Sequence, residues 1–314
     1  MRVAVPLEVK AGEKRVALVP DIINKLTRLG YEVVIQSGAG DNSQGTDAAF
    51  AAAGATVVKG DVLAGADVVL SVQPLTPAQL ATLKKGAITI SFLSTVTAVD
   101  SIDAAIKAGV TAFSLELVPR ISRAQSMDAL TSQALCAGYR AVLVGAEMSP
   151  RFFPLLMTAA GTVTPAQVLV LGAGVAGLQA IATAKRLGAV IEASDVRPAA
   201  KEQIESLGGK FVDVPFETEE EREIAQGVGG YARPMPASWM QRQAALVAER
   251  AKQADIVIAT ALIPGRKAPT LLHSETVAQM KPGSVVIDLA AGKGDNGGGN
   301  CPLTEADKVV VKHG

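Results

Sequence analysis

Residues 168–177 read Val-Leu-Val-Leu-Gly-Ala-Gly-Val-Ala-Gly, an apolar run that leads into a glycine-spaced turn. A helical stretch over 178–187 and a second apolar run over 190–194 follow, and Asp195 comes directly after that run. Strand, glycines, helix, strand and acidic residue in this order make up a complete dinucleotide fingerprint, not a lone G-x-G-x-x-G. The stretch therefore predicts a βαβ unit that binds a dinucleotide. The alternative is a glycine-rich turn that binds nothing.

The three glycines of the turn have separate tasks. Gly172 permits the tight turn, Gly174 lets the backbone approach a pyrophosphate, and Gly177 lets the helix pack closely on the strand. The N–H groups and partial positive charge at the helix start favour phosphates. Asp195 can accept hydrogen bonds from the adenosine ribose, and its charge would repel a 2′-phosphate, so the sequence favours NAD(H) over NADP(H). Arg197 weakens that preference.

The composition is typical of a globular protein with two domains. The chain has 314 residues, of which 49% are hydrophobic and 19% charged, enough for two separate cores. Thirty basic and thirty acidic residues cancel, so no basic field attracts nucleic acid or an anionic membrane. No apolar run approaches the roughly 20 residues that span a bilayer, and the start of the chain resembles no signal peptide. We therefore expect a cytoplasmic chain without direct membrane insertion.

Few residues are suited to metal or nucleophilic chemistry. His273 and His313 are the only histidines, and neither has a companion at metal-ligand or catalytic-triad spacing. Cys136 and Cys301 lie far apart, so we expect reduced thiols in a reducing compartment. The sequence predicts no metal site.

Apolar runs alternate with amphipathic stretches along the chain, which favours parallel, helix-covered sheets. In the first third we expect strands over 3–5, 32–35, 55–58, 67–72, 87–92 and 110–113. After the fingerprint we expect further strands over 210–214, 256–259, 284–289 and 308–311. A helical stretch over 134–147 separates the two halves. The predicted fold class is therefore α/β, with two Rossmann-like doubly wound domains, residues 1–133 and 134–314, and an interdomain cleft that the nucleotide crevice faces.

Two loops carry further candidate groups. Residues 118–128 read Val-Pro-Arg-Ile-Ser-Arg-Ala-Gln-Ser-Met-Asp. This loop can hold a charge, an amide and a carboxylate near a nicotinamide, or it can be a helix-capping turn with Ser126 or Asp128 as the N-cap. Residues 227–236 read Gly-Val-Gly-Gly-Tyr-Ala-Arg-Pro-Met-Pro, which indicates either a surface loop or a lid over a bound nucleotide.

The segment 119–128 closely resembles the signature loop of the proton-translocating nicotinamide nucleotide transhydrogenases, in their peripheral NAD(H)-binding component. The resemblance extends over essentially the whole chain, including residues 13–20, 158–163, 260–265 and 283–290. Alanine dehydrogenases share the two-domain fold and many of these blocks, and they carry a catalytic lysine and a catalytic histidine. The corresponding places here are Gln73 and Ser94. Because the acid–base groups for amino-acid oxidation are missing, the sequence favours a transhydrogenase.

The resemblance also implies a set of site residues. The nicotinamide and its ribose would contact the proposed catalytic set of Arg120, Gln125 and Asp128, together with Ile121, Ser122, Ser126, Met127 and Thr131. The pyrophosphate would lie against Gly172, Ala173, Gly174, Val175 and Gly177, and the adenosine ribose against Asp195, Val196 and Arg197. Gly230 and Tyr231 would form the tip of the family's mobile loop, and Leu262 would lie beside the cofactor.

The implied reaction is direct hydride transfer between NADH bound here and NADP⁺ on a separate NADP(H)-binding component. A membrane-spanning component would couple this transfer to proton translocation. The resemblance further implies a homodimer that is held at the inner face of the cytoplasmic membrane by its partners. An alanine-type amino-acid dehydrogenase and a non-catalytic nucleotide-binding protein are the alternatives. Family members usually continue beyond Gly314 with a helix that returns to the first domain, so a longer natural chain is an open alternative.

Overall fold

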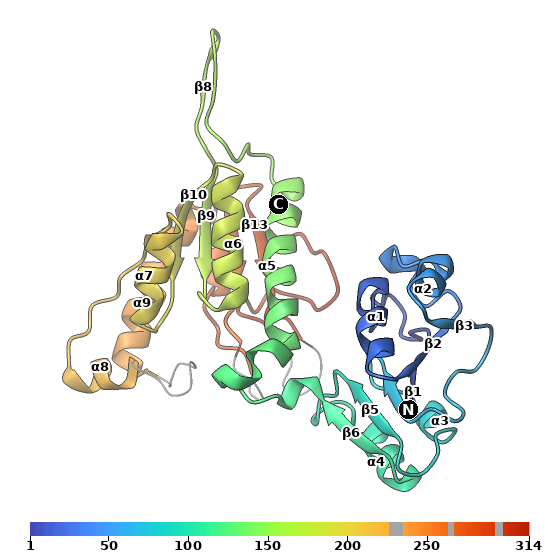
Figure 1. Ribbon diagram of the computed structural model, residues 1–314. Helices are drawn as coiled ribbons and strands as arrows, with labels where there is room; N and C mark the ends of the chain where they lie inside the picture. Colours follow the sequence, from blue (N-terminus) through green and yellow to red (C-terminus); the bar gives the residue numbers. More distant parts are fainter. Residues whose placement is uncertain (226–234, 263–266, 293–297, 314) are drawn as a thin grey trace. The chain divides into compact units, whose positions relative to one another are not determined.

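The computed structural model describes residues 1–225, 235–262, 267–292 and 298–313 (Figure 1). Contacts divide the chain into an N-terminal unit, Met1–Leu130, and a C-terminal unit, Thr131–Gly314. Each unit is built on a parallel sheet flanked by helices. The predicted α/β class with two Rossmann-like sheets is confirmed, whereas the cleft between the domains stays a prediction.

The N-terminal unit contains a parallel sheet in the order β3-β2-β1-β4-β5-β6. Its strands are β1 (Arg2–Val5), β2 (Glu32–Gln36), β3 (Thr56–Val58), β4 (Val68–Leu70), β5 (Ile88–Ser91) and β6 (Thr111–Ser114). Its helices are α1 (Pro20–Arg28), α2 (Asp47–Ala52), α3 (Pro77–Leu80) and α4 (Val99–Ala108), with short 3₁₀ helices η1 (Asp41–Ser43), η2 (Leu115–Leu117) and η3 (Ser122–Met127). All six strands expected in the first third of the sequence are present.

Alternate residues of the strands enter two separate cores, because successive side chains of a strand point to opposite faces of the sheet. Val34 and Val69 pack in one cluster, whereas Val33 and Ile35 pack in the other, which contains Phe50 of α2. Both faces of the sheet are therefore covered, as a parallel sheet requires.

The C-terminal unit contains a parallel sheet in the order β11-β10-β9-β12-β13. Its strands are β9 (Gln167–Leu171), β10 (Val190–Ser194), β11 (Lys210–Phe211), β12 (Ile256–Ala259) and β13 (Val285–Asp288), and β7 (Leu156–Thr158) and β8 (Gly161–Val163) form an antiparallel hairpin. Its helices are α5 (Ala129–Met148), α6 (Val175–Arg186), α7 (Ala199–Ser206), α8 (Glu219–Ala225), α9 (Ala237–Gln253) and α10 (Ser274–Val277).

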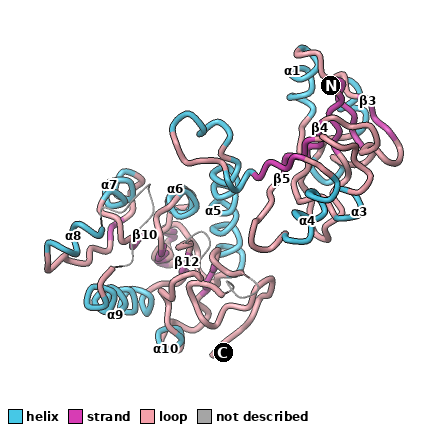
Figure 2. The backbone as a smooth tube through the Cα atoms, turned by 90° about the horizontal axis from the view of Figure 1, so that it is seen from below, coloured by secondary structure: helices cyan, strands magenta, loops and turns pink. Residues whose placement is uncertain are grey.

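Helices cover both faces of this second sheet. Figure 2 shows α5, α6 and α7 on one side of β10 and β12, and α9 and α10 on the other. The first layer packs on alternate strand residues such as Val168 and Ile258. The second layer packs on the residues between them, such as Leu169 and Val257. This arrangement confirms the doubly wound fold predicted from the alternating pattern.

Two expected elements differ from the structure. The strand predicted over 308–311 is wrong: within the described residues no strand lies beside this segment, so its backbone has no ladder to join. Val309 and Val311 are 75% and 81% exposed, and Lys308 and Lys312 pair with Glu305 instead. The helix predicted over 134–147 begins earlier, at Ala129. Its first turn was not predicted, because Thr131 and Ser132 have modest helix propensity.

A close approach between α5 and α6 gives a test of this packing. A Cβ on Gly138 of α5 would overlap the carbonyl oxygen of Ala176 in the first turn of α6. A Cβ on Gly145 in the same helix would lie 3.3 Å from Cγ2 of Ile256, a contact that a small adjustment relieves. We expect Gly138→Ala to destabilise the protein by about 1–3 kcal/mol through overpacking. Gly145→Ala should be near neutral, since alanine favours a helix by roughly 1 kcal/mol over glycine.

Chemical denaturation of both variants measures this difference. An equal denaturant midpoint for Gly138→Ala and the wild type would contradict the close packing of α5 on α6.

Candidate functional site

The glycine turn between β9 and α6 has no room for a side chain at two of its positions. Gly172 has a φ of +93°, a region that favours glycine, and a Cβ there would lie 2.9 Å from Oγ1 of Thr260. A Cβ on Gly177 would overlap the carbonyl oxygen of Gly172. The tasks predicted for these two glycines, a tight turn and close packing of helix on strand, agree with this geometry.

The start of α6 has room for a phosphate group. Apart from Gly174 and its two chain neighbours, no atom of the described residues lies within 4 Å of the position that a Cβ on Gly174 would take. Gly174 is the N-cap of α6, which runs for 12 residues. The first N–H groups of a helix have no partner within the helix and attract anions. The open space and these donors fit the pyrophosphate of a dinucleotide.

A buried asparagine holds the neighbouring turn after β12. Oγ1 of Thr260 donates to the carbonyl oxygen of Gly172 at 2.9 Å. The Asn300 side chain is fully buried, accepts from the N–H of Ala261 at 3.0 Å and donates to its carbonyl oxygen at 2.9 Å. Leu262, the next residue, is 58% exposed. Sequence reasoning missed Asn300, whose only signal was its place behind a glycine-rich loop.

Asp195 follows β10 and lies beside the same turn. Its Oδ2 accepts from the N–H of Ala173 at 2.7 Å, and its two oxygens pair with the Arg197 guanidinium at 2.9 Å. The Asp195 side chain is 8% exposed. The hydrogen bond that the Arg197 side chain donates to Asp195 raises the pKa of Arg197 above its ordinary value. The predicted ribose acceptor thus already accepts hydrogen bonds from the protein.

The signature loop lies in the N-terminal unit. Residues 122–127 form η3, and Asp128 directly precedes α5, the position that an N-cap residue takes. Ala124 is buried and anchors the loop, whereas Ile121 and Met127 are 55% and 57% exposed. The backbone N–H of Ala124 donates to the carbonyl oxygen of Ile121. The loop therefore presents apolar and polar side chains together at the surface of its unit.

The structure thus gathers the predicted residues into two groups. Gly172, Ala173, Gly174, Val175, Gly177, Asp195, Val196 and Arg197 meet at the carboxyl ends of β9 and β10, and Leu262 follows the adjacent β12. Arg120, Ile121, Ser122, Gln125, Ser126, Met127 and Asp128 lie in the N-terminal unit, and Thr131 is in the first turn of α5. Gly230 and Tyr231 lie outside the described residues. The role of every one of these residues stays a prediction.

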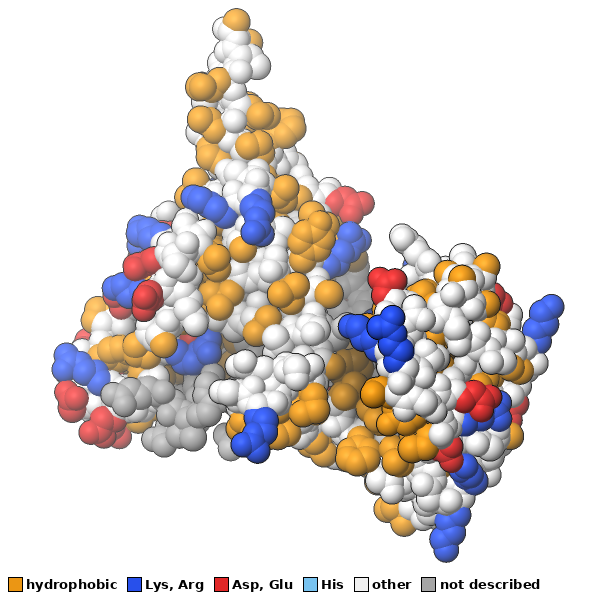
Figure 3. All heavy atoms as spheres, in the orientation of Figure 1, with side chains coloured by type: hydrophobic (Ala, Val, Ile, Leu, Met, Phe, Trp, Pro, Cys, Tyr) orange, Lys and Arg blue, Asp and Glu red, His pale blue; other side chains and the backbone are white. Residues whose placement is uncertain are grey.

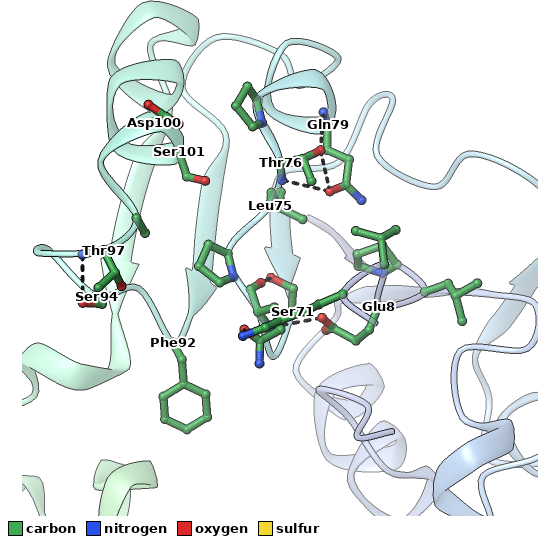
Figure 4. A pocket seen from close by; sticks show the side chains of 18 of the residues that line it. Glu8, Ser71, Leu75, Thr76, Gln79, Phe92, Ser94, Thr97, Asp100 and Ser101 are labelled. Atoms are coloured by element: carbon green, nitrogen blue, oxygen red, sulfur yellow. Dashed lines mark hydrogen bonds between the residues drawn. The ribbon is translucent and has the colours of Figure 1, made fainter. Parts of the chain in front are cut away.

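The N-terminal unit has a cavity of its own (Figure 4). Its volume is about 600 Å³, and its walls are loops that follow β1, β4 and β5. The strand order reverses between β1 and β4, and ligands of open α/β sheets bind at the carboxyl ends of strands at such a point. Gln73 and Ser94, which the resemblance aligns with the catalytic positions of alanine dehydrogenases, both line this cavity; that correspondence stays a prediction.

Gln73 belongs to a polar network at the cavity. Its Nε2 donates to Glu13 at 2.6 Å, and its Oε1 accepts from Nζ of Lys10 at 3.2 Å. Glu13 also binds the Arg15 side chain through both carboxylate oxygens, at 2.7 and 2.6 Å. Arg15 in turn lies over the ring of Phe92. The charges of Glu13 and Arg15 are therefore neutralised by each other.

The hydrogen bond from Arg15 is the main reason that the pKa of Glu13 falls from 4.5 to about 2. Because the folded-state pKa is depressed, the ionised carboxylate stabilises the fold above pH 4.5, and this contribution is lost as the pH falls toward 2. We expect Glu13→Gln to cost about 1–3 kcal/mol at pH 7, since the hydrogen bonds are charge-assisted. The difference from wild type should shrink between pH 4.5 and 2.

Denaturant titrations across this pH range provide the measurement. Glu219→Gln is the control, because Glu219 is 73% exposed in its pair with Arg222. A stability difference for Glu13→Gln that is independent of pH would contradict the ionic role of Glu13.

Neither a metal-ligand cluster nor a helix that could span a membrane occurs among the described residues. No cluster of three potential His, Cys, Asp or Glu ligands occurs in the portion of the chain that the structure describes. Across the same residues, no helix combines the length and the apolar character of a membrane span.

Comparison with known proteins places the chain in a family. Two family models match the chain. The model for "Alanine dehydrogenase/PNT, N-terminal domain" matches residues 4–137, and the model for "Alanine dehydrogenase/PNT, C-terminal domain" matches residues 141–314. The chain is 51% identical to the first portion of the NAD(P) transhydrogenase alpha subunit of Rhodospirillum rubrum, over all of this chain and 82% of that protein. It is 34% identical to alanine dehydrogenase of Mycobacterium tuberculosis, over all of this chain and 78% of that enzyme.

A solved structure agrees with these relatives. The transhydrogenase of Sinorhizobium meliloti has a TM-score of 0.86 and 44% identity, over all of this chain and 84% of that one. The resemblance inferred from the sequence, and its preference for transhydrogenases over alanine dehydrogenases, are confirmed. The chain belongs to the alanine dehydrogenase/PNT family, on the side of the NAD(P) transhydrogenase alpha subunits.

Proposed function

We propose that this chain is the NAD(H)-binding component of a proton-translocating transhydrogenase. Its family supports an oxidoreductase role and the binding of a nicotinamide nucleotide. The observation that supports a transhydrogenase rather than a dehydrogenase is the cavity wall at Gln73 and Ser94, where alanine dehydrogenases have acid–base groups. An amide and a hydroxyl suit a reaction in which no substrate proton has to move.

The residues of the chain bind and orient the nucleotide. The N–H groups at the start of α6 hold the pyrophosphate, and Asp195 selects NAD(H) through the adenosine ribose. Arg120, Gln125 and Asp128 hold the nicotinamide end and fix the face from which hydride leaves. A bound nicotinamide supplies the hydride chemistry, and the protein supplies position and the exclusion of water.

The binding of NADP(H) and the translocation of protons belong to other components of the enzyme. An NADP(H)-binding component presents the second nicotinamide, and a membrane-spanning component couples the transfer to proton movement. The name of the Rhodospirillum rubrum relative describes one portion of an alpha subunit, which supports a division of the enzyme into separate pieces. We propose a Re/Si-specific reaction that needs these partners, and a peripheral position at the inner face of the cytoplasmic membrane.

The second copy of a homodimer would bind the hairpin of β7 and β8. Residues 152–163 contain no charged side chain, and Met157 is 73% exposed. In Figures 1 and 3 the hairpin projects from the body of the C-terminal unit and carries apolar side chains. Because an isolated two-stranded hairpin is marginally stable in water, burial against another copy would stabilise it.

The function is tested by reconstituted exchange. We expect the chain to transfer hydride from NADH to an NADP⁺ analogue only when the NADP(H)-binding component is added. Gln125→Asn should slow exchange at least about tenfold with little change in the Kd for NADH, because it misplaces the ring and keeps the anchors. Gln253→Asn, at the exposed end of α9, is the control.

Reduction of pyruvate with ammonia by the chain alone would replace the proposal with an alanine-type dehydrogenase. NADH binding without exchange under any combination of components would indicate a non-catalytic nucleotide-binding protein.

The dimer is tested by Met157→Asp. A charge in a buried apolar interface costs several kcal/mol unless it is paired, so we expect the variant to be monomeric in analytical ultracentrifugation. Ile106→Asp introduces the same charge at a residue of α4 with 70% exposure and should leave the dimer intact. A dimeric Met157→Asp protein would exclude the hairpin from the interface.

A further inference from the structure

We propose that Arg197 occupies the ribose-binding oxygens of Asp195 until a nucleotide displaces it, and that this pair sets the choice between NAD(H) and NADP(H). The inference rests on the proposed function, since it concerns the same nucleotide site. Arg197 would thus determine, together with Asp195, how strongly the site discriminates against NADP(H).

The carboxylate of Asp195 accepts four hydrogen bonds from residues that the structure describes. Oδ1 accepts from the backbone N–H of Arg197 and from its Nε, both at 2.9 Å. Oδ2 accepts from the N–H of Ala173 at 2.7 Å and from Nη2 of Arg197 at 2.9 Å. An ionised carboxylate has about four acceptor positions, so these donors use its capacity. A ribose hydroxyl can bind Asp195 only if one of them leaves.

The guanidinium is the donor group that can leave. The N–H of Ala173 is fixed in the glycine turn between β9 and α6, and the backbone N–H of Arg197 closes a local turn with Asp195. The Arg197 side chain, in contrast, has a long rotatable stem and is 26% exposed. Its departure opens one acceptor position on each carboxylate oxygen. Two adjacent ribose hydroxyls supply two donors for these positions, so the guanidinium stands in for a diol.

The same exchange affects the binding of NADP(H). A 2′-phosphate replaces a donor hydroxyl by negative charge, and Asp195 opposes that charge. The displaced guanidinium remains two residues away, and arginine pairs with phosphate through two parallel hydrogen bonds. The pair therefore opposes NADP(H) less strongly than a lone carboxylate would.

Calorimetric titration of the whole chain with NADH and with NADPH tests this inference. In Arg197→Ala we expect NADH to bind as tightly as in wild type or more tightly, and NADPH to bind more weakly. The ratio of the two Kd values should rise at least about tenfold in favour of NADH, a difference of about 1.4 kcal/mol. In Asp195→Asn, which keeps the shape and removes the charge, the ratio should shift at least about tenfold toward NADPH.

Arg186→Ala is the matched control, because it removes the same charge at the opposite end of α6, and thermal unfolding checks that every variant is folded. Equal weakening of both nucleotides by Arg197→Ala, or a loss of NADH affinity beyond that of the control, overturns the inference. Those results leave the proposed function standing if the wild type binds NADH and completes exchange. A wild-type chain that binds no NADH removes both.

Discussion

The site depends on one backbone contact, the approach of α6 to the carbonyl oxygen of Gly172. No Cβ fits at Gly177 against that oxygen, and none fits at Gly138 against the first turn of the same helix. With both glycines in place, the start of α6 lies at the carboxyl end of β9, next to Asp195. Helix donors and the ribose acceptor therefore meet at one edge of the sheet, where a dinucleotide carries its phosphates and its adenosine ribose.

The N-terminal unit shows a complementary feature beside its cavity, where the charges of Glu13 and Arg15 are paired. Glu13 and Arg15 bind each other, and Gln73 joins them as a neutral amide. A carboxylate substrate would have to displace Glu13 from Arg15. That displacement would break the hydrogen bonds that lower the pKa of Glu13 to about 2. This arrangement is consistent with a site that orients a ring and moves no substrate proton.

The sequence predicted those portions of the fold that follow from local pattern. Apolar runs separated by amphipathic stretches were sufficient for the strands of both sheets, and glycine spacing was sufficient for the turn before α6. The hairpin of β7 and β8 was missed, because its apolar residues join none of the cores formed by the described residues. Asn300 and the Asp195–Arg197 pairing were also missed. Both depend on side-chain contacts that composition and periodicity do not encode. The strand predicted over 308–311 was wrong because, in the described part of the chain, no strand pairs with this segment.

The proposed reaction is direct hydride transfer between two nicotinamides, in which the transferred hydrogen never exchanges with solvent. Its most direct test uses NADH with deuterium at the transferring position of the ring, NADP⁺, and the reconstituted components in ordinary water. We expect NADPH that carries one deuterium for each NADH oxidised, with none lost to solvent. Loss of the deuterium to water, or NADPH without label, would contradict it, since either result requires an acid–base or stepwise route through other groups.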